Sequence, residues 1–185
     1  MRNFFLTICA SIALTAGTPS FALYDPAPIA SMAGLEGSWR GSLQYRDYQP
    51  PFGKVTLSTQ LYAALVGPNE LALHYIFDDG PAKIIHSYDR LKIDLPAKTV
   101  TFTAAKAGET IAAKVVSSFE VAGMLEVVAE TVKAKSTMRY TLRLSAAEIE
   151  ILKEEADGII AGTDAEKPAA KFAFRSKYSF ARAAK

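Results

Sequence analysis

Apolar and polar residues alternate with a period of two along most of the chain, a pattern typical of β-strands with one buried face. In the segment 35–46, Trp39, Leu43 and Tyr45 fall on one face, and polar residues fall on the other. Clusters of Gly, Pro, Asn and Asp interrupt the alternation and predict turns. Further strands are predicted at 54–65, 70–78, 83–93, 99–104, 110–121, 124–132, 136–144, 148–153 and 172–183.

Residues 146–156 leave two alternatives open. Their Ala, Glu and Leu content favours a helix, whereas the alternation in Glu148-Ile149-Glu150-Ile151 favours a strand, which is the alternative we prefer. About ten strands joined by short links predict an all-β protein: a single up-and-down antiparallel β-barrel. Closure of the barrel would remove the exposed sheet edges.

The first 22 residues have the pattern of a cleavable signal peptide. Arg2 supplies a positive start, residues 4–16 are almost wholly apolar, and Ser20-Phe21-Ala22 supplies small residues for cleavage after Ala22. We therefore expect a periplasmic or secreted protein. Residues 23–34 are predicted to form a linker with a short helical turn, and residues 35–185 the barrel domain.

The composition argues against several classes of function: thiol chemistry, nucleic-acid binding and membrane spanning by a helix. The only cysteine is Cys9, so cleavage would leave no thiol for disulfides, redox chemistry or metal binding. The 21 basic and 19 acidic side chains are interspersed, so no basic face for nucleic acid is expected. No later apolar segment is long enough for a membrane helix, and we expect no transmembrane segment after cleavage.

The sequence Leu35-Glu36-Gly37-Ser38-Trp39 resembles the Gly-x-Trp opening of the calycins, which include lipocalins, fatty-acid-binding proteins and nitrobindins. The resemblance implies that Gly37 and Trp39 close one end of the barrel after a short helical turn. It also implies that a basic residue near the end of the last strand packs across the Trp. Ten strands fit the fatty-acid-binding and nitrobindin branches. The lipocalin Thr-Asp-Tyr motif and the Arg-x-Tyr pair of fatty-acid-binding proteins are absent.

Period-two alternation identifies this basic residue as Arg182. It places Arg182 on the apolar face of the last strand, where a cation–π contact with Trp39 can form, and it places Arg175 on the other face. The predicted apolar face of this strand consists of Phe172, Phe174, Ser176, Tyr178, Phe180 and Arg182.

The two histidines, His74 and His86, flank the predicted turn at 78–81. If Phe77 pairs with Lys83, the histidines lie opposite each other on one face; if Asp78 pairs with Lys83, they point to opposite faces. Two histidines are too few for a structural zinc site, and we predict no metal site. One imidazole could ligate a haem, as in nitrobindin-like barrels; otherwise both are surface residues of a hairpin. No other cofactor is expected.

Tyrosines on the predicted inner faces bring large rings and hydroxyl groups that need partners. Thr59, Ser117 and Ser176 would add polar groups on the same faces. A filled core, with each hydroxyl bonded to the backbone, is the alternative to a ligand cavity. The candidate ligand-binding residues are Tyr45, Tyr75, His86, Tyr140, Ser176 and Tyr178.

No signature of a catalytic serine elbow, zinc protease or nucleotide-binding loop is present. We therefore expect a non-catalytic barrel that binds a small apolar or amphipathic ligand in its lumen. Two alternatives stay open. One is a structural or interaction protein of the cell envelope with a filled barrel core. The other is an enzyme on a barrel scaffold, with acid–base chemistry by His86 or Asp79.

Overall fold

The computed structural model describes residues 30–49, 52–157 and 171–183. These residues form ten strands and one short helix, α1 (Ala30–Ala33). The strands, in chain order, are β1 (Gly37–Arg46), β2 (Lys54–Gly67), β3 (Glu70–Asp78), β4 (Ile84–Asp94), β5 (Thr99–Ala104), β6 (Glu109–Val121), β7 (Met124–Lys133), β8 (Ser136–Ser145), β9 (Glu148–Asp157) and β10 (Ala173–Arg182). The predicted signal peptide lies outside the described residues.

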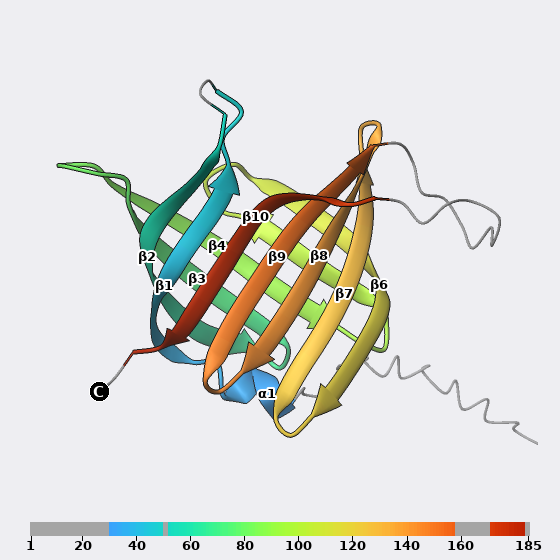
Figure 1. Cartoon of the computed structure of the whole chain (residues 1–185). Coiled ribbons are helices and arrows are strands. Elements are labelled where there is room, and N and C mark those ends of the chain that lie inside the picture. Colours follow the sequence, from blue (N-terminus) through green and yellow to red (C-terminus); the bar gives the residue numbers. More distant parts are fainter. Residues whose placement is uncertain (1–29, 50–51, 158–170, 184–185) are drawn as a thin grey trace, which may run out of the picture.

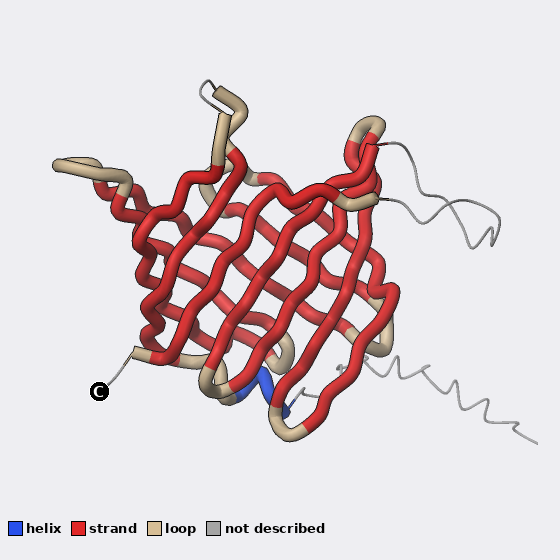
Figure 2. The backbone as a smooth tube through the Cα atoms, viewed as in Figure 1, coloured by secondary structure: helices blue, strands red, loops and turns tan. Residues whose placement is uncertain are grey.

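The strands close into one barrel. Each strand pairs antiparallel with its neighbours in sequence, and β1 pairs with β10 to complete the ring, from Trp39 opposite Arg182 to Tyr45 opposite Ser176. Figure 1 shows these strands tilted around a common interior, and Figure 2 shows the loops gathered at the two ends of the wall. The predicted all-β, up-and-down antiparallel barrel is confirmed.

Alternation of side chains drives strand formation, as β3 illustrates. Leu71, Leu73, Tyr75 and Phe77 are buried, whereas the residues between them are only partly buried. The turns also follow local chemistry. Ala122 and Gly123 join β6 to β7 with φ angles of 50° and 76°, as a two-residue type I′ turn requires.

Residues 148–157 form strand β9, so the helical alternative for this segment is wrong. Ile149 and Ile151 are buried on the inner face, and β9 pairs with both β8 and β10. This burial outweighs the helical propensity of Ala, Glu and Leu, since ordinary residues differ in helix propensity by no more than about 0.7 kcal/mol per residue.

A β-bulge in β10 changes the expected face of its first residues. The register shifts between Phe174 and Ser176, and Arg175 is the extra residue. The rings of Phe172 and Phe174 therefore lie on the outer wall, where Arg139 and Lys54 contact them at 3.7 and 4.5 Å. The expectation that both Phe rings share a face with Tyr178 is wrong.

A second bulge, in β6, lies between Val115 and Ser117. Beyond it Ser117 pairs with Val128, on the outer side of β7, and is exposed. The expectation that Ser117 faces the interior is wrong for the same reason, because one inserted residue reverses every later side chain of a strand.

One end of the barrel is closed by the segment that precedes β1. Met32 and Leu35 are fully buried, and the indole N–H of Trp39 donates to the carbonyl of Leu35 at 3.0 Å. The guanidinium of Arg182 lies 4.2 Å from the Trp39 ring centre. Gly37 has a φ of 126°, and a Cβ there would lie 2.9 Å from Arg182. At the opposite end, the described residues form no such cover (Figure 1).

The described residues also form no helix that is long and apolar enough to cross a membrane.

Candidate lumen binding site

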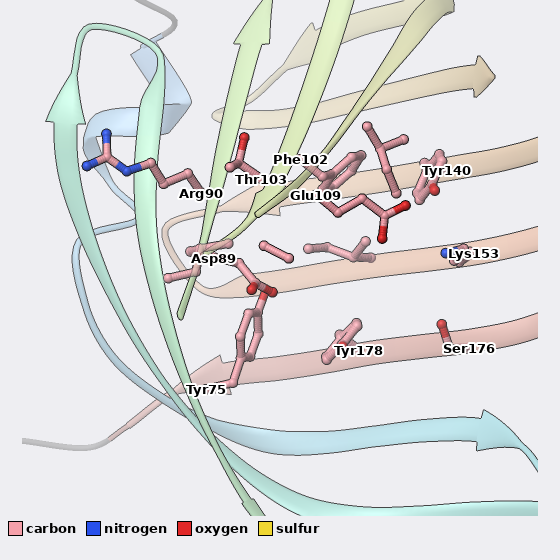
Figure 3. Close-up of a pocket in the computed structure, with 14 residues that line it drawn as sticks. Tyr75, Asp89, Arg90, Phe102, Thr103, Glu109, Tyr140, Lys153, Ser176 and Tyr178 are labelled. Atoms are coloured by element: carbon pink, nitrogen blue, oxygen red, sulfur yellow. The ribbon is translucent and has the colours of Figure 1, made fainter. Parts of the chain in front are cut away.

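A cavity of about 210 Å³ lies inside the barrel. Figure 3 shows side chains converging on it from β3, β4, β8, β9 and β10. We call this space the lumen cavity. It is lined by Leu73, Tyr75, Asp89, Arg90, Phe102, Thr103, Ala104, Glu109, Ile111, Tyr140, Ile151, Lys153, Ser176 and Tyr178.

Three tyrosines supply large rings to the lumen cavity. The rings of Tyr75 and Tyr178 lie 5.2 Å apart, centre to centre, and the ring of Tyr140 lies 4.7 Å from that of Phe102. Tyr75 is only 3% exposed and Tyr140 only 5%. These contacts fix the rings, so the hydroxyl groups have defined positions at the cavity wall.

The tyrosine hydroxyls are desolvated. Burial raises the pKa of Tyr75 well above its ordinary value, with further contributions from Tyr178 and Asp89. Burial, followed by the nearness of Asp89, raises the pKa of Tyr178 to about 12. Within the described part of the chain, the side-chain hydrogen bonds include none to the hydroxyls of Tyr75, Tyr140 or Tyr178. These hydroxyls remain available to a ligand.

Asp89 brings a carboxyl group to the same cavity. It belongs to the inner row of β4, with Leu91 and Ile93. Burial raises its pKa, although the hydroxyl of Ser87 donates to it at 3.2 Å and partly offsets that effect. Asp89 is not among the site residues predicted from the sequence. Its place two residues before Leu91, in a strand with period-two alternation, was the signal that could have identified it.

Lys153 brings an amine to the cavity from β9, and it was also missed. It continues the inner row of Ile149 and Ile151 and lies 5.3 Å from the Tyr140 ring centre. Burial lowers its pKa, and the charges of Arg175 and Lys133 lower it further.

The two carboxylates that act electrostatically on Lys153, those of Glu109 and Glu155, are already engaged with other cations. Glu109 pairs with Lys133 at 2.5 Å, and Glu155 pairs with Arg175. Among the described residues, no carboxylate lies within ion-pair distance of the Lys153 amine. The amine therefore faces the cavity without an ion-pair partner.

The structure brings four of the six predicted ligand-binding residues to the lumen cavity: Tyr75, Tyr140, Ser176 and Tyr178. Tyr45 lies in an adjoining hollow that it shares with Lys153, Arg175 and Ser176. Thr59 is also buried, but its hydroxyl donates to the carbonyl of Leu57 at 3.1 Å.

His86 lies elsewhere, on the outer face of β4, which corrects its expected placement. Asp78 pairs with Ile84, which is neither of the two registers considered from the sequence. His74 is also on the outer wall, so the described residues offer no imidazole to a haem in the lumen. They also contain no group of three or more His, Cys, Asp or Glu side chains that could hold a metal ion. Asp79 pairs with Lys83 at the hairpin tip.

Comparisons with known proteins identify the fold alone. No family model and no curated protein matches the sequence. The structure is similar to the crystal structure of Rv2717c from M. tuberculosis, with a TM-score of 0.56 over 86% of this chain and 100% of that chain. The two sequences are 13% identical, so the similarity says nothing about a shared ligand.

Proposed function

We propose that this chain is an exported, non-catalytic barrel of the calycin type that binds a small apolar or amphipathic ligand in its lumen. One observation carries the proposal. The buried hydroxyl of Tyr75 and the partly buried polar groups of Tyr178, Asp89 and Lys153 face a cavity, and the protein satisfies them only in part. The predicted signal peptide supports export.

The energetic cost of these groups supports a ligand site over a simple core. A buried polar group without a hydrogen bond costs about 1–3 kcal/mol. Phe at the positions of Tyr75 and Tyr178 would keep the ring contacts and avoid that cost. The hydroxyls are therefore better explained by a molecule that hydrogen-bonds to them.

The chemistry of the cavity wall favours an amphipathic ligand. Leu73, Ile111 and Ile151 supply apolar surface. Asp89 and the tyrosine hydroxyls can bind a polar group, and the Lys153 amine can bind an acceptor or an anion. At about 210 Å³ the cavity is below the usual range of roughly 300–1,000 Å³ for drug-sized ligands, so the ligand is small.

The small cavity also favours a second candidate function, an envelope interaction protein whose barrel is only a scaffold. Val116, Phe119 and Val121 of β6 are each about half exposed, at 53, 48 and 57%. Exposed apolar side chains that cluster on one strand are typical of interaction surfaces. In this alternative a partner protein would cover β6, and the lumen would hold only water.

Native mass spectrometry of the mature protein, purified from its own host, distinguishes the two functions. The ligand-binding barrel is expected to retain a small molecule. Ala104→Leu fills the lumen cavity and should abolish retention, whereas Ala112→Leu, exposed on the outer side of β6, should not. A wild-type protein that repeatedly carries no ligand, or an Ala104→Leu variant with full occupancy, would overturn the proposal. Copurification of one partner protein with an empty barrel would favour the second function.

A further inference from the structure

The two histidines of the chain meet on the outer wall of the barrel. Ile76 lies opposite His86 and His74 lies opposite Tyr88, so the histidines are diagonal neighbours on one face of the β3–β4 hairpin. Nε2 of His74 and Nδ1 of His86 lie 2.9 Å apart and share a hydrogen bond, in which one ring donates its N–H to the other. The ring centres are 5.2 Å apart, and the ring planes differ by 24°.

Neighbouring rings hold this pair in place. His74 stacks on Tyr88 with 4.3 Å between centres and 14° between planes, and Tyr62 contacts its other side at 5.9 Å. No rearrangement of the strands is needed to bring the two nitrogens together.

The same distance also suits two ligands on one metal ion, once the ring that donates the hydrogen bond has shifted its proton to its other nitrogen. Imidazole nitrogens lie about 2.0–2.1 Å from a bound transition metal. With a right angle between the two bonds, the nitrogens are then about 2.9 Å apart. We propose that His74 and His86 form a surface site for a divalent transition-metal ion, with His74 Nε2 and His86 Nδ1 as adjacent ligands.

The donor set selects the metal class. Imidazole nitrogen suits Cu²⁺, Ni²⁺ and Zn²⁺ rather than Mg²⁺ or Ca²⁺, and affinity among the first three is highest for Cu²⁺. The described residues add no third His, Cys, Asp or Glu to the pair. Water must fill the remaining positions, so the ion is exchangeable and open to a further ligand. The site is not a structural metal centre.

The metal site is separate from the lumen cavity. His74 and His86 lie on the outer face of the sheet, whereas Tyr75 and Asp89, their neighbours in β3 and β4, line the lumen cavity on the other face. Metal binding and lumen binding are therefore expected to be independent.

Titration of the mature protein with Cu²⁺ at neutral pH tests the proposal, with affinity measured by calorimetry and the ligands identified by electron paramagnetic resonance. One equivalent of Cu²⁺ should bind, and its spectrum should show two coordinating nitrogens. His74→Asn and His86→Asn should each weaken this binding about tenfold or more, since even changes to residues behind the ligands typically cost 10–100-fold. Tyr88→Phe keeps the stacked ring and should leave the affinity unchanged.

The double variant His74→Asn/His86→Asn measures binding elsewhere, including at the chain terminus. Circular dichroism of each variant checks that the barrel is folded. If the wild type binds Cu²⁺ no more tightly than the double variant, or if either single variant keeps full affinity, the two-histidine site does not exist.

Discussion

Arg182 gives the clearest test of how the barrel is closed at its covered end. Its guanidinium donates to the backbone carbonyls of Ala146 at 2.6 Å, Glu36 at 2.8 Å and Gly34, and it lies over the ring of Trp39. These contacts link β10 to the β8–β9 turn and to the segment before β1. The substitution Arg182→Lys keeps the positive charge but replaces a planar fork of donors by a single ammonium.

The expected decrease in the free energy of unfolding can be estimated from these hydrogen bonds. The lysine side chain is shorter and ends in a single ammonium, so it can keep only one of the three hydrogen bonds. Hydrogen bonds from charged donors contribute about 1.5–3 kcal/mol when buried, but Arg182 is exposed, so about 1 kcal/mol for each of the two lost bonds is appropriate. We expect a decrease of about 2 kcal/mol in the free energy of unfolding, which is about 4–8 °C in Tm for a domain of this size.

Thermal unfolding followed by circular dichroism measures this effect. Arg143→Lys is the matched control, because Arg143 pairs with Glu126 and Glu150 on the outer wall at 2.6 and 3.5 Å. Surface ion pairs contribute about 0–1 kcal/mol, and lysine preserves the charge, so Tm should change by less than about 2 °C. Equal shifts for the two variants, or an unchanged Tm for Arg182→Lys, would refute the closure role of Arg182.

Three further substitutions test the wall and the lumen. Asp89→Asn should raise the free energy of unfolding at pH 7, because burial raises the pKa of Asp89 above 3.8 in the folded state and so makes its carboxylate unfavourable there. Below pH 3.8 the carboxyl is protonated in both states, so the gain measured by urea unfolding should disappear. A gain that does not depend on pH would contradict this reasoning. Gly41→Ala should cost about 3 kcal/mol in the same assay, because its Cβ would lie 1.9 Å from the carbonyl oxygen of Ser179; an unchanged stability would show that β1 and β10 can separate. Lys153→Met should weaken binding of a small anionic amphiphile, measured by calorimetry, roughly tenfold. Binding of the neutral analogue should not change, and equal effects on both probes would rule out a charge contact.

Most of the wall could be predicted from the sequence, because each inner row is set by the side-chain period of two. The segment 148–157 shows why this works even against helical propensity: Ile149 and Ile151 can be buried together only if the chain is extended. Turn residues then limit where each strand ends. The order of the strands follows from their short connections.

The bulges at Phe174–Ser176 and Val115–Ser117 could not be predicted in this way. A bulge inserts one residue into a strand without changing its composition. The alternation read from the sequence therefore runs on unbroken, although the side chains on the two sides of the bulge follow opposite alternations in the structure. The register of the β3–β4 hairpin was missed for a related reason. Its turn includes Ala82 with a φ of 62°, an unusual conformation for a residue with a side chain, and nothing in the sequence indicates it.

Two charged residues support the proposed lumen site more strongly than its tyrosines do. Asp89 and Lys153 face the same cavity with opposite charges, yet no ion pair joins them within the described residues. Burial disfavours the ionised form of each, as the directions of their pKa shifts show. Apolar residues at both positions would give a more stable core, and a direct ion pair would fill the space between them. Retention of two separated charges at a cost in stability is typical of a functional site, and it is the feature that a merely structural barrel does not need.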